Sequence, residues 1–97
     1  MKKDNEMKLG EAIQLFLKRN GLEEKLLETE IYGRWEELVG RGINSKTRKV
    51  ELRDGVLHVL LTSSVLRNEL RMRRSVLLES INQRLAPRAV IRDLKFR

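Results

Sequence analysis

The sequence predicts an α+β domain. Two N-terminal helices, a β-hairpin, a long helix and a final strand would form a three-stranded sheet covered on one face by helices. Apolar residues recur at helical spacing in residues 8–39 and again in residues 64–85. They alternate with polar residues on both sides of Asp54-Gly55, and another strand-like segment follows the long helix. Because 97 residues suffice for one domain, we expect residues 8–97 to form a single domain after a flexible N-terminus at residues 1–7.

Two helices are predicted before the hairpin. The first covers about residues 8–19 and ends at Asn20-Gly21, since both residues tolerate the left-handed conformation of a helix end. The second covers about residues 22–39, with a break near Glu30. The apolar sides consist of Leu9, Ile13, Phe16 and Leu17 in the first helix and of Leu27, Ile31, Trp35 and Leu38 in the second. We interpret Trp35 as a core anchor. The glutamates of the second helix are interpreted as a solvated face or a contact for a basic partner.

The hairpin is predicted from its turn. Asp54-Gly55 is a favoured two-residue type I′ turn, which pairs Arg53 with Val56. The same register pairs Leu52 with Leu57, Glu51 with His58 and Val50 with Val59. It gives one apolar side, made of Val50, Leu52, Leu57, Val59 and Leu61, and an opposite side made of Lys49, Glu51, Arg53, His58 and Leu60.

A long helix is predicted after the hairpin. Ser63 or Ser64 would cap it, and it would end near Leu85, before Pro87. Its buried stripe would consist of Leu66, Leu70, Leu77 and Ile81, helped by Met72 or Val76. A last strand is predicted at about residues 90–96, with Leu94 and Phe96 on one face.

The composition excludes several classes of function. The chain has no cysteine, which excludes disulfides, thiolate zinc sites and cysteine nucleophiles and fits a reducing cytoplasm. Its one histidine cannot build a histidine metal cluster. Acidic residues near the N-terminus argue against an export signal, and no apolar run is long enough to span a membrane. We therefore expect no catalytic residue, metal, cofactor or small-molecule substrate, and no membrane association.

The charge is divided unevenly along the chain. Residues 1–40 carry 7 basic and 9 acidic side chains, whereas residues 41–97 carry 14 basic and 5 acidic side chains. The net charges of the two parts are therefore −2 and +9, which together give the +7 of the whole chain. Such a division is typical of a domain whose second part meets a polyanion.

Arginines in the predicted long helix form the strongest candidate site. Arg67, Arg71 and Arg74 would lie on one helix face, opposite the leucines, with Arg73 beside them. Guanidinium groups pair with phosphate or carboxylate through two hydrogen bonds, so the cluster suits an anionic partner. Two further basic groups are Arg41, Lys46, Arg48 and Lys49 before and within the first strand, and Arg88 and Arg92, with Lys95 and Arg97, near the C-terminus. If all three groups share a side, nucleic acid would bind between them without sequence specificity and with strong salt dependence.

One family resemblance covers about residues 9–97. It rests on Trp35-Glu36-Glu37-Leu38-Val39-Gly40, on the segment from Gly55 to Ser64, on Glu69-Leu70, and on the closing segment from Ile91 to Arg97. These motifs resemble the DciA-type family of bacterial proteins. The resemblance implies a fold similar to a K-homology domain and a role with the replicative DNA helicase, with affinity for DNA and no ATPase activity. Some family members carry a long basic tail, whereas this sequence stops at Arg97.

Three functions remain open from the sequence. The first is a non-enzymatic replication accessory protein that binds the replicative DNA helicase and, weakly, DNA. The second is an RNA-binding module similar to a K-homology domain, although the GXXG loop of such domains is absent and aromatic residues are few. The third is a protein–protein adaptor whose basic face meets an acidic protein.

Overall fold

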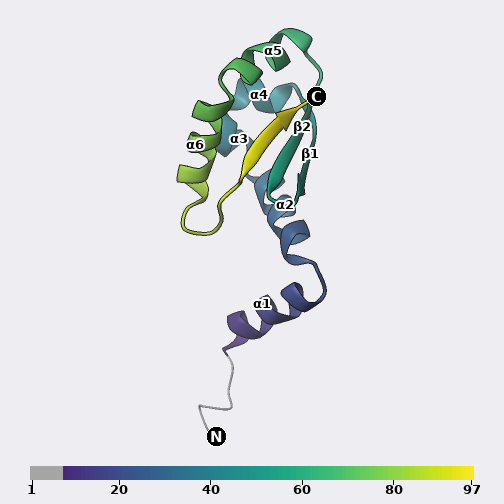
Figure 1. Ribbon diagram of the computed structural model, residues 1–97, viewed down its shortest axis with the longest axis vertical. Helices are drawn as coiled ribbons and strands as arrows, with labels where there is room; N and C mark the ends of the chain where they lie inside the picture. The colour runs from purple at the N-terminus through teal and green to yellow at the C-terminus, as the bar shows by residue number, and fades with distance from the viewer. Residues whose placement is uncertain (1–7) are drawn as a thin grey trace, which may run out of the picture.

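The computed structural model describes residues 8–97, so the expectation of a flexible segment at residues 1–7 lies outside the described residues (Figure 1). In chain order the elements are α1 (Leu9–Arg19), α2 (Glu23–Gly33), α3 (Trp35–Val39), α4 (Arg41–Ser45), β1 (Thr47–Arg53), β2 (Val56–Leu61), α5 (Ser64–Met72), α6 (Arg74–Leu85) and β3 (Asp93–Phe96). The sheet has the order β1-β2-β3, with β1 antiparallel and β3 parallel to β2. The predicted α+β class and the three-stranded sheet are confirmed.

The hairpin has the predicted register. Arg53 pairs with Val56, and the next pairs follow as expected to Val50 and Val59. Asp54 and Gly55 have φ angles of 51° and 80°, both positive, as a type I′ turn requires. The turn therefore sets which side of β1 and β2 is buried.

The helices are shorter and more numerous than predicted. The second predicted helix ends at Gly33 and resumes at Trp35, so its break lies at Arg34, a few residues after the expected position. Gly40, with a φ of 93°, ends α3, and the short helix α4 follows, which the sequence analysis did not predict. A helix of five residues is too short for apolar periodicity to reveal it.

The predicted long helix is two helices, which corrects that expectation. Ser63 caps α5, because its Oγ accepts a hydrogen bond of 3.1 Å from the Leu66 backbone N–H. The helix stops at Arg73, whose φ and ψ of −111° and 20° lie outside the helical range, and α6 begins at Arg74. Leu70 and Ile81 are buried as predicted, but Met72 and Val76 are 85% and 71% exposed and do not contribute to the core.

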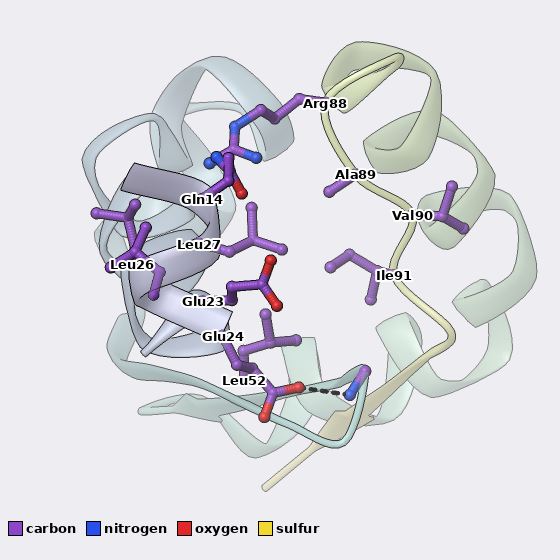
Figure 2. Close-up of a pocket in the computed structure, with 12 residues that line it drawn as sticks. Gln14, Glu23, Glu24, Leu26, Leu27, Leu52, Arg88, Ala89, Val90 and Ile91 are labelled. Atoms are coloured by element: carbon purple, nitrogen blue, oxygen red, sulfur yellow. Dashed lines mark hydrogen bonds between the residues drawn. The ribbon is translucent and has the colours of Figure 1, made fainter. Parts of the chain in front are cut away.

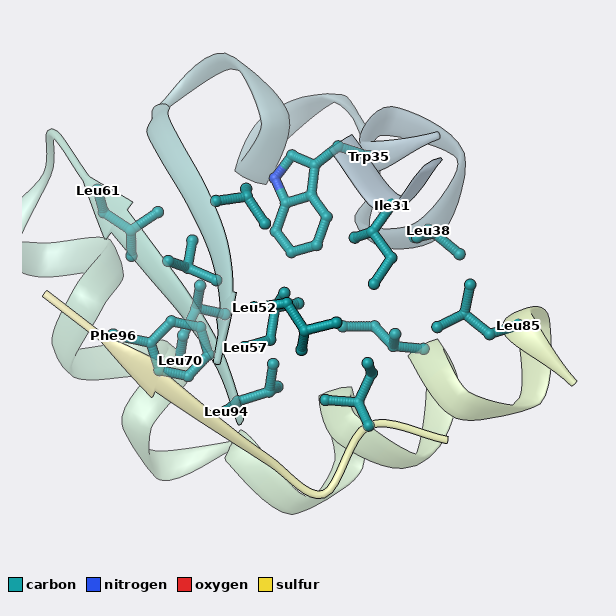
Figure 3. Close-up of a cluster of buried hydrophobic side chains, with 14 residues drawn as sticks. Ile31, Trp35, Leu38, Leu52, Leu57, Leu61, Leu70, Leu85, Leu94 and Phe96 are labelled. Carbon is teal, nitrogen blue, oxygen red and sulfur yellow. The ribbon is translucent and has the colours of Figure 1, made fainter. Parts of the chain in front are cut away.

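The core fills the space between the sheet and the helices (Figure 3). One sheet side supplies Val50, Leu52, Leu57, Val59, Leu61, Leu94 and Phe96, all of them buried. Trp35, which we expected to anchor the core, is 1% exposed, and its Nε1–H donates a hydrogen bond of 2.9 Å to Thr47 Oγ1. The indole thus ties α3 to the start of β1 while it fills the core.

Two glutamates of α2 hold the hairpin, a role that the sequence analysis did not anticipate. Glu24 accepts hydrogen bonds from the backbone N–H groups of Asp54 and Gly55, at 3.0 and 2.8 Å. Glu28 accepts one of 2.9 Å from the Leu52 backbone N–H, which points away from β2. These carboxylates therefore cover part of the outer edge of β1 and the turn.

Helix α1 stands apart from the rest of the domain (Figure 1). It contains no buried residue. Leu9, Ile13 and Phe16, on its apolar side, are 77%, 47% and 59% exposed. The amphipathic pattern thus predicted the helix correctly, although this apolar side is not packed against the core.

Candidate nucleic-acid interface

The arginines of α5 and α6 do not form one uniform row. Arg71 donates a hydrogen bond of 3.0 Å from Nη2 to the Phe96 carbonyl oxygen, and Arg74 Nε lies 3.6 Å from Asp93 Oδ1. Both arginines therefore bind the outer edge of β3. Arg67 is half-buried and Arg73 is exposed, and neither has an ion pair within residues 8–97. Because α5 ends at Met72 and Arg73 is not helical, the helical spacing assumed for Arg71 and Arg74 is interrupted between them.

The basic residues near β1 lie beside the start of α5. The Lys46 carbonyl oxygen accepts a hydrogen bond of 2.8 Å from the Thr62 backbone N–H, just before the cap of α5. The Arg97 backbone N–H donates a hydrogen bond to the Val59 carbonyl oxygen, and its carbonyl oxygen accepts one from the Leu61 N–H. Arg97 therefore lies at the same end of the sheet. We call this region the basic end and define it as Lys46, Arg48, Arg67, Arg71 and Arg97. Two of the four predicted residues near β1 have acidic neighbours: Arg41 lies 3.7 Å from Glu36, and Lys49 lies 3.2 Å from Glu51.

Arg88 and Arg92 lie at the opposite end of the strands. Arg92 donates two hydrogen bonds, of 3.2 and 2.7 Å, to the Asp54 carbonyl oxygen in the hairpin turn. Arg88 pairs with Glu30 of α2 at 3.2 Å. The structure thus brings parts of two predicted groups to one end of the sheet, the arginines of the long helix and the basic residues near β1. It separates Arg88 and Arg92 from them.

The side of the sheet that faces away from the core is also basic. Leu94 and Phe96 point into the core, so the alternation of side chains sends Lys95 and Arg97 to the opposite side. The register sets Lys95 beside His58, which in turn pairs with Glu51. We call this the open face and define it by three rows across the sheet: Arg53, Val56 and Asp93; Glu51, His58 and Lys95; and Lys49, Leu60 and Arg97.

His58 reports the electrostatics of the open face. Burial lowers its pKa below the ordinary value, and the positive charges of Arg53, Arg97 and Lys95 lower it further, while Glu51 acts in the opposite direction. Lys49 holds the pKa of Glu51 below its usual range, chiefly through their hydrogen bond. Burial and the neighbouring cations thus disfavour the protonated form of His58.

Sequence reasoning missed the open face as a unit. It placed Arg53 and His58 on the polar side of the hairpin and Lys95 and Arg97 in a C-terminal group. Only the pairing of β3 with β2 joins them. The alternation of buried and exposed residues from Leu94 to Arg97 was the available signal, but it does not reveal the neighbouring strand.

A hollow of about 310 Å³ lies between the α1–α2 region and the segment before β3 (Figure 2). Leu27, Leu52 and Ile91 give it apolar walls. Of the two carboxylates in its lining, Glu23 and Glu24, the second is bonded to the turn, and the cation Arg88 is paired with Glu30. No group of three or more metal-ligating side chains is found among residues 8–97. Within the same residues, no helix is both long and apolar enough to cross a membrane.

Comparisons with known proteins find one family. The family model described as "Dna[CI] antecedent, DciA" matches residues 8–96. A protein named UPF0232 from Mycobacterium tuberculosis strain H37Rv is 32% identical over 87 residues, which cover 90% of this chain and 46% of the relative. A UPF0232 protein from Rhodococcus jostii is 33% identical over 72 residues, or 74% of this chain and 38% of the relative. The chain thus spans less than half the length of these curated relatives.

Proposed function

The chain belongs to the DciA family, and from this membership we propose that it is a non-enzymatic accessory protein of DNA replication. It would act in the cytoplasm, bind the replicative DNA helicase and bind DNA weakly without sequence specificity. The observation that carries the proposal is the family match, which covers nearly every residue that the structure describes. The association with the replicative helicase comes from the family, and the DNA affinity is argued from charge.

The basic end supports the DNA part of the proposal. Lys46 and Arg48 are exposed, and Arg97 lies at the same end of the sheet, on the other side of β2. None of these three side chains has a carboxylate partner within 4.0 Å among residues 8–97. Cations without a local counterion are free to replace the counterions of a phosphate backbone, and the release of those counterions favours binding.

Salt dependence tests the DNA part. Affinity for a forked or single-stranded DNA oligomer is measured by fluorescence anisotropy at several salt concentrations. We expect a steep linear fall of the logarithm of the binding constant with the logarithm of the salt concentration. Lys46→Glu with Arg48→Glu should weaken binding at least tenfold, whereas Lys18→Glu with Arg19→Glu, an equal charge change on α1, should have a smaller effect. Absence of DNA binding even at low salt would refute this part.

Co-purification tests the helicase part. The tagged protein is recovered from its native cells with and without nuclease, and binding is then repeated with purified replicative helicase. We expect the helicase to remain bound after nuclease treatment. If the protein does not bind purified helicase in any nucleotide state, the helicase part of the proposal is refuted.

The two experiments also separate the other candidate functions. Retained helicase without measurable DNA affinity would make the protein an adaptor. Tighter binding of an RNA oligomer than of the DNA oligomer of the same sequence would favour the RNA-binding module.

A further inference from the structure

We propose that the open face is the surface along which a nucleic-acid backbone lies, with Arg53, Lys95 and Arg97 as its phosphate contacts around His58. This inference rests on the proposed DNA binding and assigns it a place. The basic end adjoins this surface through Arg97, which belongs to both.

The first support is the absence of a helix over this side of the sheet. The helices that contact the strands share one core with them, and this core lies on one side of the sheet. In each strand it takes every second residue, such as Val50 in β1, Leu57 in β2 and Phe96 in β3. On the other side, Arg53, Lys95 and Arg97 are exposed, and so is Leu60, at 38%. No described element covers these side chains, so they are available to a ligand.

The second support is an excess of positive charge. The face has two carboxylates, and both are engaged. Glu51 lies 3.2 Å from Lys49 Nζ, and Asp93 pairs with Arg74 at 3.6 Å while it accepts a hydrogen bond of 2.8 Å from the Leu94 backbone N–H. Arg53, Lys95 and Arg97 have no carboxylate partner within 4.0 Å among residues 8–97. Arg53 on β1 and Lys95 and Arg97 at β3 lie on either side of the central strand β2, and such like charges repel one another unless an anion lies between them.

The third support is the unsatisfied histidine at the centre of the face. His58 Nδ1 is the one side-chain nitrogen or oxygen atom, among the described residues, that is buried without a hydrogen-bond partner. Buried polar atoms normally have a partner in the protein, in solvent or in a ligand, so the partner of this nitrogen would come from outside the chain. A hollow of about 140 Å³ lies beside it, with Lys49, Glu51, Leu60 and Arg97 in its lining. The centre of the open face thus holds a ring nitrogen that has no hydrogen-bond partner within residues 8–97.

The chemistry of the face selects the ligand. It carries guanidinium and ammonium groups, which bind phosphate oxygens, and its apolar members are Val56 and Leu60. No aromatic side chain is available there to stack on a base. The face is thus suited to the phosphates of a nucleic acid and not to the recognition of its bases, which agrees with binding without sequence specificity.

The single histidine makes a direct test. His58 is the only histidine of the chain, so its ring protons give one NMR titration curve. Phosphates on the open face would neutralise the cations that now oppose its protonation, and would themselves favour the imidazolium. We expect saturating single-stranded DNA at low salt to raise the pKa of His58 by about half a unit or more.

The titration separates two kinds of failure. If DNA binds, as anisotropy shows under the same conditions, but the His58 titration does not move, the open face is not the site and DNA binding stands. If no DNA binds at all, the proposed DNA binding fails with it.

Charge reversal gives a second test. Lys95→Glu with Arg97→Glu should weaken DNA binding at least tenfold and should lower the salt slope by about two, because two phosphate contacts are lost. The matched control is again Lys18→Glu with Arg19→Glu, and circular dichroism verifies that each variant folds. Equal losses in the two double variants would attribute the effect to net charge and overturn the inference. Loss of helicase binding with full DNA affinity would instead make the face a protein contact.

Discussion

The guanidinium of Arg71 in α5 donates a hydrogen bond of 3.0 Å to the carbonyl oxygen of Phe96 at the end of β3. This carbonyl points away from β2, so the arginine covers the outer edge of the last strand. Arg74 also contacts β3, through an ion pair with Asp93. Two of the four arginines that the sequence singled out for anion binding thus also join α5 and α6 to β3, and a variant that reverses both would disturb these contacts.

Arg71→Ala should destabilise the domain by about 1–3 kcal/mol, because a charge-assisted hydrogen bond is lost and a strand carbonyl loses its partner. Urea unfolding followed by Trp35 fluorescence measures the effect. Arg73→Ala, which removes an exposed arginine two residues away, is the matched control and should change the free energy of unfolding by less than about 0.5 kcal/mol. Similar values for the two variants would contradict a structural role for Arg71.

Glu24→Ala should destabilise the domain by about 1–3 kcal/mol, because the backbone N–H groups of Asp54 and Gly55 lose their acceptor. Hydrogen exchange should show faster opening of these two amides. Glu23→Ala, which removes the neighbouring exposed carboxylate, is the control and should leave their exchange unchanged. Unaltered exchange in the Glu24 variant would show that the carboxylate does not hold the turn.

The free energy of unfolding should depend on pH through His58. Its pKa is depressed in the folded protein, so the unfolded chain binds the proton more readily. The stabilising contribution is complete above the unfolded pKa, which is near 6.5, and is lost as the pH falls towards the lower folded pKa. In His58→Gln this part of the pH dependence should disappear. Urea unfolding between about pH 7.5 and pH 5 measures it, because this range spans the ordinary histidine pKa of about 6.5. An identical pH dependence in this variant would exclude His58 as its source.

Phe16→Ser in α1 should leave the free energy of unfolding within about 0.5 kcal/mol of the unmodified protein, because the ring is 59% exposed. Trp35→Ala should cost about 3–5 kcal/mol, because the indole is buried in the core. Thermal or urea unfolding compares the two. A large loss in the Phe16 variant would show that the apolar side of α1 is buried in solution.

The sequence by itself determined those features that depend on neighbouring residues. Asp54-Gly55 and the alternation around it gave the register of β1 and β2, because a two-residue turn leaves one way to pair them. Of the two serines predicted as the cap, Ser63 and Ser64, the structure shows Ser63 at the start of α5. The α+β class followed from the order in which segments with helical spacing of apolar residues and segments with strand-like alternation occur along the chain. The end of α5 at Arg73 was not visible, since the leucine spacing continues through it.

Only the tertiary structure decided what the basic residues do. The parallel pairing of β3 with β2 placed Lys95 beside His58, although they are far apart in the sequence. The same strand gave Arg71 and Arg74 their partners. Periodicity along the chain predicts which side of an element is buried, but it carries no information about which distant element lies alongside. The assignment of an arginine to the fold or to a ligand depends on that neighbour.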